Sequence, residues 1–300
     1  MEAEVSVRVP ASSANLGPGF DCLALTLDLW NEATFYPAES GITVEVEGEG
    51  KGLLPQDRSN LVIRAAAAVY EHFHRQMPGL RVRCSNRIPM GSGLGSSAAT
   101  SIMGLLGANA LTGGQLNRNE ILEMAIQLEG HPDNAAAALY GGLVVIADQD
   151  ECPWLVRRFD LPVLQAVLIL PEIDLPTRAA RAVLPKKVVL NDAVFNIGRA
   201  VLVMEALRAG DFQLLGEVMD DRLHQPYRLP LIPGAAGAIA VARQMGAAAA
   251  ISGAGPSVIA FTREDPVSTG NAMVAEFHQA GTRARSFVLQ TTNQGAQVKL

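Results

Sequence analysis

The stretch IPMGSGLGSSAATSIMGLLGANAL, residues 88–111, begins as a glycine-rich loop and continues as a run of helix-forming residues. Glycine lets the backbone adopt positive φ angles and approach a ligand closely, and the first turn of a helix leaves its N–H groups unpaired. Together with the helix dipole, these N–H groups form an anion site. The lysine of the common nucleotide loop, G-x-x-x-x-G-K-[ST], is absent. The stretch therefore indicates a phosphate site without a loop lysine; a tight turn with serine caps and no ligand is the alternative.

The composition of the whole chain is that of a globular protein. Of its 300 residues, 49% are hydrophobic and 18% are charged, which suits one large domain or two modest ones. The formal net charge of -6 argues against a nucleic-acid partner. No run approaches the ~18 consecutive apolar residues of a membrane helix, and the N-terminus is acidic where a signal peptide is basic. We therefore expect a cytoplasmic protein with no membrane partner.

The three cysteines, Cys22, Cys84 and Cys152, are far apart in the sequence and form no C-x-x-C pair. We expect reduced thiols with a structural role, and neither a disulfide framework nor a zinc site. The five histidines do not form a metal-binding pattern either.

Hydrophobic periodicity divides the chain into strands and helices. Strands are predicted at residues 5–12, 23–37, 42–50, 80–89, 141–148, 163–172 and 283–290, and as a pair around a glycine turn at 247–262. Helices are predicted at 60–77, 96–111, 116–130, 191–219 (broken at Gly210–Asp211), 234–246 and 266–281. Because strands alternate with helices but also follow one another directly, the order favours an α+β protein over a doubly wound sheet. We place two lobes at residues 1–157 and 158–300.

Four motifs follow one another along the chain: VPASSANLGPGFDCLALTLDL (9–29), PMGSGLGSSAA (89–99), EGHPDNAAAALYGG (129–142) and ISGAGPSVIAF (251–261). The last three resemble motifs of the galactokinase, homoserine kinase, mevalonate kinase and phosphomevalonate kinase superfamily, the GHMP kinases. The first is similar to the N-terminal signature of homoserine kinases. The resemblance implies a two-lobed fold with an N-terminal lobe holding the phosphate loop, a ferredoxin-like C-terminal lobe and the site between them. It also implies a homodimer and the phosphorylation of L-homoserine by ATP.

The sequence departs from the family pattern at a few positions. Homoserine kinases usually have glycine where Ala24 stands and often a basic residue where Ser92 stands. A proline common after the D-N pair is absent. None of these changes removes a group that we assign to chemistry, although Ser92 leaves the loop less positive.

The resemblance implies that the loop binds the phosphates of ATP through Pro89, Met90, Gly91, Ser92, Gly93, Leu94, Gly95, Ser96, Ser97, Ala98 and Ala99. Asn60 is expected at the adenine, and helix capping is its alternative role. Mg²⁺ is expected at Ser97 and Glu129, with Glu123 as the second choice for the carboxylate. Phosphoryl transfer needs mainly positioning and charge stabilisation, which the loop and Mg²⁺ supply.

The same resemblance assigns residues to the acceptor. Asp133 and Asn134 are expected at the acceptor hydroxyl, with or without a role for the aspartate as a base; capping of the following helix is the alternative. Asn15 and Asp21 are expected to bind the ammonium group, and their alternative is a turn stabilised by the Asn side chain. Arg181 and Arg228 are expected to bind the carboxylate, for which the planar guanidinium is suited. The alternative for each arginine is an ordinary solvent-exposed side chain with no ligand.

Two other functions stay open at this point. One is a related kinase that acts on mevalonate or another small alcohol. The other is a nucleotide-binding regulator without turnover, whose sequence would show a broken loop, a missing metal ligand or a lost acceptor site. The loop, the metal ligand and the acceptor site are all intact in this sequence, which favours the enzyme.

Overall fold

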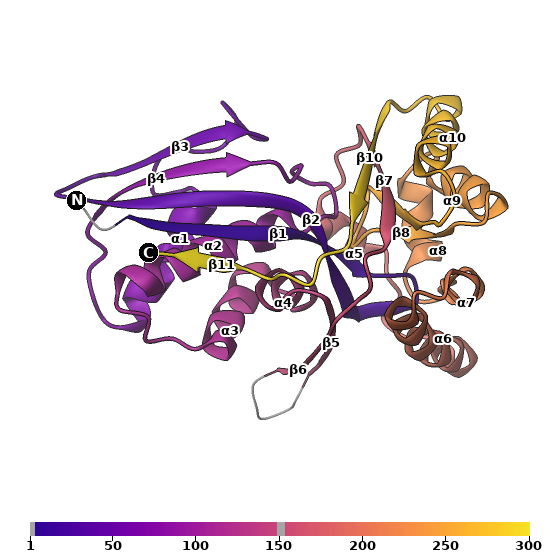
Figure 1. The fold of residues 1–300 in the computed structure, drawn as a ribbon, viewed down its shortest axis with the longest axis horizontal. Helices are drawn as coiled ribbons and strands as arrows, with labels where there is room; N and C mark the ends of the chain where they lie inside the picture. Colours follow the sequence, from indigo (N-terminus) through magenta and orange to yellow (C-terminus); the bar gives the residue numbers. More distant parts are fainter. Residues whose placement is uncertain (1–3, 149–153) are drawn as a thin grey trace.

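The computed structural model describes residues 4–148 and 154–300, and within them the chain forms a seven-stranded and a four-stranded sheet. Figure 1 shows the two sheets with their helices as two lobes side by side. This is the α+β, two-lobed architecture that the sequence predicts. Cys152 lies outside the described residues.

The larger sheet belongs to the N-terminal lobe and has the order β11-β1-β2-β4-β3, with β5 paired to β2 and β6 to β5. Its strands are β1 (Val5–Asn15), β2 (Gly19–Ala38), β3 (Ile42–Gly48), β4 (Gly79–Asn86), β5 (Leu143–Ala147), β6 (Leu155–Phe159) and β11 (Gln297–Lys299). Its helices are α1 (Leu61–His72), α2 (Ser96–Leu111), α3 (Arg118–Glu129) and α4 (Asp133–Tyr140). Helices α2 and α4 pack against β1 and β2, because alternate side chains of a strand point to the same face and those of β1 are apolar.

The smaller sheet belongs to the C-terminal lobe, has the order β10-β7-β9-β8, and is antiparallel throughout. Its strands are β7 (Gln165–Pro171), β8 (Ala248–Ile251), β9 (Val258–Phe261) and β10 (Ala284–Gln290). Helix α9 (Ala235–Gln244) precedes β8, and α10 (Pro266–Gln279) connects β9 to β10, which gives the predicted ferredoxin-like order βαββαβ. The other helical elements are α5 (Thr177–Ala182), α6 (Leu190–Ala209), α7 (Phe212–Val218), α8 (Gln225–Arg228) and the 3₁₀ helix η1 (Leu229–Leu231). Among the described residues, no helix combines the length and the apolar character needed to cross a membrane.

The strongest periodic patterns are confirmed. The helix predicted at residues 96–111 is α2, with the same ends. The predicted break at Gly210–Asp211 separates α6 from α7, and the Asp211 side chain caps α7 by accepting a hydrogen bond from the N–H of Leu214. The short elements β6, α5, α8 and β11 are missing from the predicted segments. The predicted lobe boundary between residues 157 and 158 falls inside β6, and β11 pairs with β1, so the division of the chain at this point remains a prediction.

A continuous hydrophobic core runs through both lobes. Leu25 of β2, Leu168 of β7 and Phe261 of β9 belong to it, and each is 0% exposed. Because protein interiors are packed as densely as organic crystals, this core holds one lobe against the other.

The two described cysteines, Cys22 and Cys84, are free thiols. Burial, with a smaller effect of Asp21 and then Asp133, raises the pKa of Cys22 to about 11, and burial raises the pKa of Cys84 to about 12. Both thiols therefore stay protonated near neutral pH and are poor nucleophiles.

Candidate active site

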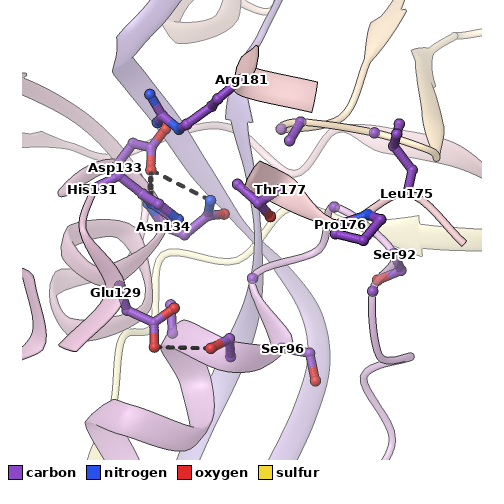
Figure 2. Close-up of a pocket in the computed structure, with 18 of the residues that line it drawn as sticks. Ser92, Ser96, Glu129, His131, Asp133, Asn134, Leu175, Pro176, Thr177 and Arg181 are labelled. Carbon is purple, nitrogen blue, oxygen red and sulfur yellow. Dashed lines mark hydrogen bonds and ion pairs between the residues drawn. The ribbon is translucent and has the colours of Figure 1, made fainter. Parts of the chain in front are cut away.

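A cavity of about 430 Å³ lies where the two lobes meet. Figure 2 shows Glu129 and Asp133 on one side of it and Leu175 and Pro176 on the other. Most residues predicted from the sequence line this cavity, namely Asn15, Asp21, Gly91, Ser92, Gly93, Gly95, Ser96, Ser97, Ala98, Glu129, Asp133, Asn134, Arg181 and Arg228. The fold thus gathers residues from both lobes around one space.

The glycine-rich loop is held between the two lobes at the start of α2. Gly95 is the N-cap of α2 with a φ of 67°, a left-handed conformation that favours glycine. A side chain at Gly95 would overlap the hydroxyl of Ser12 and press on the side chain of Asn134. On the opposite side, the hydroxyl of Ser252 donates to the carbonyl oxygen of Gly93 over 2.9 Å. Because glycine has no side chain to cap the helix, the first N–H groups of α2 are available to an anion.

Glu129 is the last residue of α3 and faces the start of α2. Its Oε1 accepts hydrogen bonds from the hydroxyls of Ser97 (2.9 Å) and Ser101 (2.6 Å). A carboxylate is unfavourable at a helix C-terminus, which already carries partial negative charge, so a cation bound there would stabilise it. Glu123 is not among the residues that line the cavity. The geometry therefore favours Glu129 as the carboxylate that could hold a metal ion beside the loop.

Asp133 is a buried carboxylate held by its neighbours. Its Oδ1 lies 2.9 Å from Nδ1 of His131 and accepts the N–H of Asn134 over 2.7 Å. Burial raises the pKa of Asp133, but the hydrogen bond and charge of His131, together with the N–H of Asn134 and the charge of Arg181, outweigh burial and hold the pKa below its usual range. The same hydrogen bond raises the pKa of His131. The two side chains therefore favour an ion pair, and Asp133 is a weak base.

Capping is the wrong alternative for Asp133 and Asn134. The N-cap of α4 is Pro132, and Asp133 is already the first helical residue. The side chain of Asn134 instead accepts a hydrogen bond from the hydroxyl of Ser12 over 2.9 Å. Both side chains are thus left facing the cavity.

Two arginines of the cavity wall, Arg181 and Arg228, lie over the ring of Phe20. The Nη1 and Nη2 atoms of Arg181 donate to the two carboxylate oxygens of Asp21 over 2.9 and 2.8 Å. Burial opposes the charge of Arg181, but this bidentate pair outweighs burial and raises its pKa. The residues expected to bind an ammonium and a carboxylate therefore bind each other in this structure.

Arg228 is the second arginine, and it is 1% exposed. Its hydrogen bonds go to neutral acceptors: the carbonyl oxygens of Ala180 and Gly253 and the Nδ1 of His224. Burial and then the charge of Arg181 lower the pKa of Arg228 to about 10, so it stays charged at neutral pH. Arg228 is thus a buried cation that also lines the cavity.

Asn15 lines the cavity, but both ends of its amide are engaged. Its Oδ1 accepts the N–H of Asp21 over 3.0 Å, and its Nδ2 donates to the carbonyl oxygen of Gly253 over 2.7 Å. The amide therefore joins the turn between β1 and β2 to the C-terminal lobe. A contact between Asn15 and a substrate remains a prediction.

Some predicted residues lie outside the wall of the cavity: Asn60, Pro89, Met90, Leu94 and Ala99. Asn60 caps α1, since its Oδ1 accepts the N–H of Val62 over 3.1 Å and its Nδ2 donates to the carbonyl oxygen of Pro55 over 2.6 Å. Capping is therefore confirmed for Asn60, and its place at the adenine remains a prediction.

The wall also contains residues that sequence reasoning did not assign to it: Leu128, His131, Asp174, Leu175, Pro176, Thr177, Gly253, Ala254 and Gly255. The last three belong to the C-terminal glycine motif, and that motif could have been used to predict their place in the wall. His131 is a lone histidine in a turn, and residues 174–177 show no periodic or motif pattern at all.

Comparisons with known proteins agree over nearly the whole chain. Residues 60–142 match the family "GHMP kinases N terminal domain", and residues 203–279 match "GHMP kinases C terminal". The homoserine kinase of Moorella thermoacetica is 46% identical over 294 residues, which cover 97% of this chain and 99% of the relative. The crystal structure of homoserine kinase from Cytophaga hutchinsonii has a TM-score of 0.86 at 31% identity and covers 100% of this chain and 98% of that one. The mevalonate kinase structure from Methanococcus jannaschii, with a TM-score of 0.70, 14% identity and coverage of 97% and 98%, is similar in fold alone.

Proposed function

The chain belongs to the homoserine kinase family of the GHMP kinases, and we propose that it transfers the γ-phosphoryl group of ATP to the side-chain hydroxyl of L-homoserine. The products are ADP and O-phospho-L-homoserine, a step toward threonine. The observation that supports this most is that Asp21, Arg181 and Arg228 line the same cavity as the phosphate loop. A cytoplasmic location is part of the same proposal.

The charges in the cavity suit an amino acid. L-Homoserine has a carboxylate, for which Arg228 is available because its direct partners are neutral. It also has an ammonium group, for which Asp21 is the matching anion. We infer that the bound amino acid competes with the ion pair between Asp21 and Arg181. Its ammonium group competes with Arg181 for Asp21, and its carboxylate competes with Asp21 for Arg181. Mevalonate has no ammonium group and leaves Asp21 without a new partner.

The loop suits the phosphates of ATP. Ser96, Ser97 and Ala98 of the first turn of α2 line the cavity together with Glu129. A side chain at Gly93 or Gly95 would collide with its surroundings. The hydroxyl of Ser97 and the carboxylate of Glu129 are oxygen ligands of the kind that Mg²⁺ uses together with phosphate oxygens. When bound there, Mg²⁺ neutralises phosphate charge.

Asp133 and Asn134 are the residues that we assign to the acceptor hydroxyl. Asp133 is a weak base because its pKa is lowered, chiefly by His131 acting against burial. A loose transition state needs little deprotonation of the attacking hydroxyl before transfer. We therefore infer that Asp133 and Asn134 orient the hydroxyl and that transfer proceeds without a strong base.

The test of this function is a coupled assay of ADP release with L-homoserine, mevalonate and L-threonine as acceptors. We expect the highest kcat/KM with L-homoserine. Faster turnover of mevalonate would overturn the acceptor but not the kinase activity. ATP binding without ADP release on any acceptor would support the regulator instead.

We expect the variant Glu129→Gln to lower kcat by roughly tenfold with little change in Tm. Glutamine keeps an oxygen for the hydroxyls of Ser97 and Ser101 but loses the charge that attracts Mg²⁺. The control is Glu123→Gln, on the same helix and outside the cavity wall. The measurement is the rate as a function of Mg²⁺ concentration, beside the melting temperature. Full activity of Glu129→Gln with a loss in Glu123→Gln would move the metal ligand to Glu123.

We also propose that the protein is a homodimer that uses one face of α6, formed by Leu190, Val194, Ile197 and Val201. These side chains are 75%, 61%, 66% and 58% exposed, and their spacing places them on one side of the helix. Figure 1 shows α6 at the outer edge of the C-terminal lobe. A second copy offers the same apolar face, as a two-fold interface requires.

Gly198 lies within this helix, and a side chain there would meet nothing within 4 Å inside the chain. Glycine in a helix interior costs about 1 kcal/mol relative to alanine, so packing within one subunit does not explain it. A close approach by the helix of a second copy does.

The expected result is a dimer in sedimentation equilibrium for the parent protein and a monomer for Ile197→Glu. The control is Val267→Glu, an exposed valine on α10, which we expect to remain a dimer. A monomeric parent protein, or a dimeric Ile197→Glu variant, would contradict an interface at α6.

A further inference from the structure

We propose that His224 is a positioning residue for the acceptor: its neutral imidazole holds the guanidinium of Arg228 in place and leaves the positive charge free for the carboxylate. His224 is 0% exposed, so it acts through Arg228 and not on the substrate itself. The inference rests on the proposed function, because it takes the acceptor to be a carboxylic acid.

Three hydrogen-bond contacts surround the guanidinium of Arg228. Its Nη1 lies 3.1 Å from Nδ1 of His224 and 3.2 Å from the carbonyl oxygen of Gly253, and its Nε donates to the carbonyl oxygen of Ala180 over 3.2 Å. These acceptors come from separate parts of the C-terminal lobe, and a carbonyl oxygen has no charge. Of the three contacts, the one from His224 is the only side-chain contact. It therefore decides whether Arg228 has a neutral or a charged partner.

The hydrogen of the neutral imidazole lies on Nε2 of His224. Nε2 of His224 lies 2.8 Å from the carbonyl oxygen of Gly17, and a carbonyl oxygen only accepts, so Nε2 carries the hydrogen. Nδ1 is then a bare acceptor, as the N–H of Arg228 requires. The carboxylate of Asp221 is farther, at 3.6 Å from Nε2, and its oxygens already accept the backbone N–H groups of residues 223–225.

The electrostatic surroundings of His224 favour its neutral form. Burial lowers the pKa of His224, and this outweighs the opposing effect of Asp221; the charge of Arg228 acts in the same direction as burial. A protonated imidazole would turn a second N–H toward Arg228, where two donors would face each other. A carboxylate in the place of His224 would neutralise Arg228 and compete with the substrate. A neutral histidine avoids both, and its ring is held by stacking on Phe20 with 5.3 Å between centroids.

Two variants separate positioning from plain structural support. In His224→Asn, the side-chain oxygen takes the place of Nδ1 and accepts from Arg228, but the contact with Gly17 is lost. In His224→Gln, the amide reaches Gly17, but no side-chain acceptor remains for Arg228. Both lose the stacking on Phe20 in the same way.

The measurements are kcat, the KM values for L-homoserine and ATP, and Tm. We expect His224→Gln to raise the KM for L-homoserine by roughly tenfold with the KM for ATP unchanged. For His224→Asn we expect the KM for L-homoserine to change by about threefold or less. Tm falls in both variants.

The opposite order, with His224→Asn impaired and His224→Gln close to the parent, would overturn the inference and leave His224 as an anchor for Gly17 only. A KM for L-homoserine unchanged in both variants would overturn it as well. Failure of the parent protein to phosphorylate L-homoserine is a different result, since it would reject the proposed function before any variant is compared.

Discussion

Replacing Gly95 by alanine is expected to reduce kcat/KM for Mg·ATP by roughly a hundredfold or more. Gly95 has a φ of 67° at the N-cap of α2, where a side chain is strained. The new Cβ would overlap the hydroxyl of Ser12, which donates to the side chain of Asn134 over 2.9 Å. Relief of this overlap moves the loop away from β1 or moves Asn134 away from the cavity. Either shift displaces the phosphates relative to the acceptor.

The control for this prediction is Gly281→Ala. Gly281 also has a positive φ, 77°, but a side chain there would meet nothing within 4 Å. Both variants therefore lose about 1–2 kcal/mol from the strained backbone, and only Gly95→Ala distorts the loop. Calorimetric titration with ATP, the steady-state rate and Tm separate the two effects. Parental kcat/KM in Gly95→Ala would show that the loop does not position the phosphates.

Local sequence signals were sufficient for the elements that hold this loop. Helix α2 has the predicted ends because a glycine run gives way abruptly to a stretch of helix-forming residues. The break between α6 and α7 was predictable for the same reason, since Gly210 ends one helix and Asp211 caps the next. In both places the chemistry of a few neighbouring residues decides the backbone.

The two strands that escaped prediction depend on pairing with another strand and not on a buried face. Strand β11 spans only residues 297–299 and exists because it pairs with β1. Strand β6, with the sequence LVRRF, is mostly exposed, and β5 is its one partner among the described strands. Neither has a buried face, so neither leaves a periodic trace in the sequence.

In the candidate site, too, continuous motifs could be located from the sequence, whereas contacts between distant residues could not. The loop and the residues around Asp133 could be located because each is a continuous motif. The bidentate contact between Asp21 and Arg181 joins residues 160 positions apart, and no spacing rule predicts it. The sequence suggested separate partners in the acceptor for these two residues, whereas the structure pairs them with each other. Only the fold decides which charge remains available, and that charge is on Arg228.

Replacing Arg228 by leucine is expected to lower kcat/KM for L-homoserine by roughly a hundredfold, since each hydrogen bond to a charged group contributes about 1.5–3 kcal/mol. The effect is large because Arg181 is already paired with Asp21, so Arg228 supplies the net positive charge of this end of the cavity. The KM for ATP should change little, because the hydrogen bonds of Arg228 go to Ala180, His224 and Gly253 and to no residue of the phosphate loop.

Arg228→Leu also removes the donor for the carbonyl oxygens of Ala180 and Gly253, which costs about 1–3 kcal/mol of stability. Arg228→Lys separates this loss from the loss of binding, because lysine keeps the charge but lacks the planar fork. We expect the KM for L-homoserine of Arg228→Lys to lie between the values of Arg228→Leu and the parent. The control is Arg178→Leu, at an exposed residue of the neighbouring helix α5, and we expect it to behave like the parent. A KM for L-homoserine that is the same in Arg228→Leu and in the parent would mean that the carboxylate binds without Arg228, with Arg181 as the other arginine that lines the cavity.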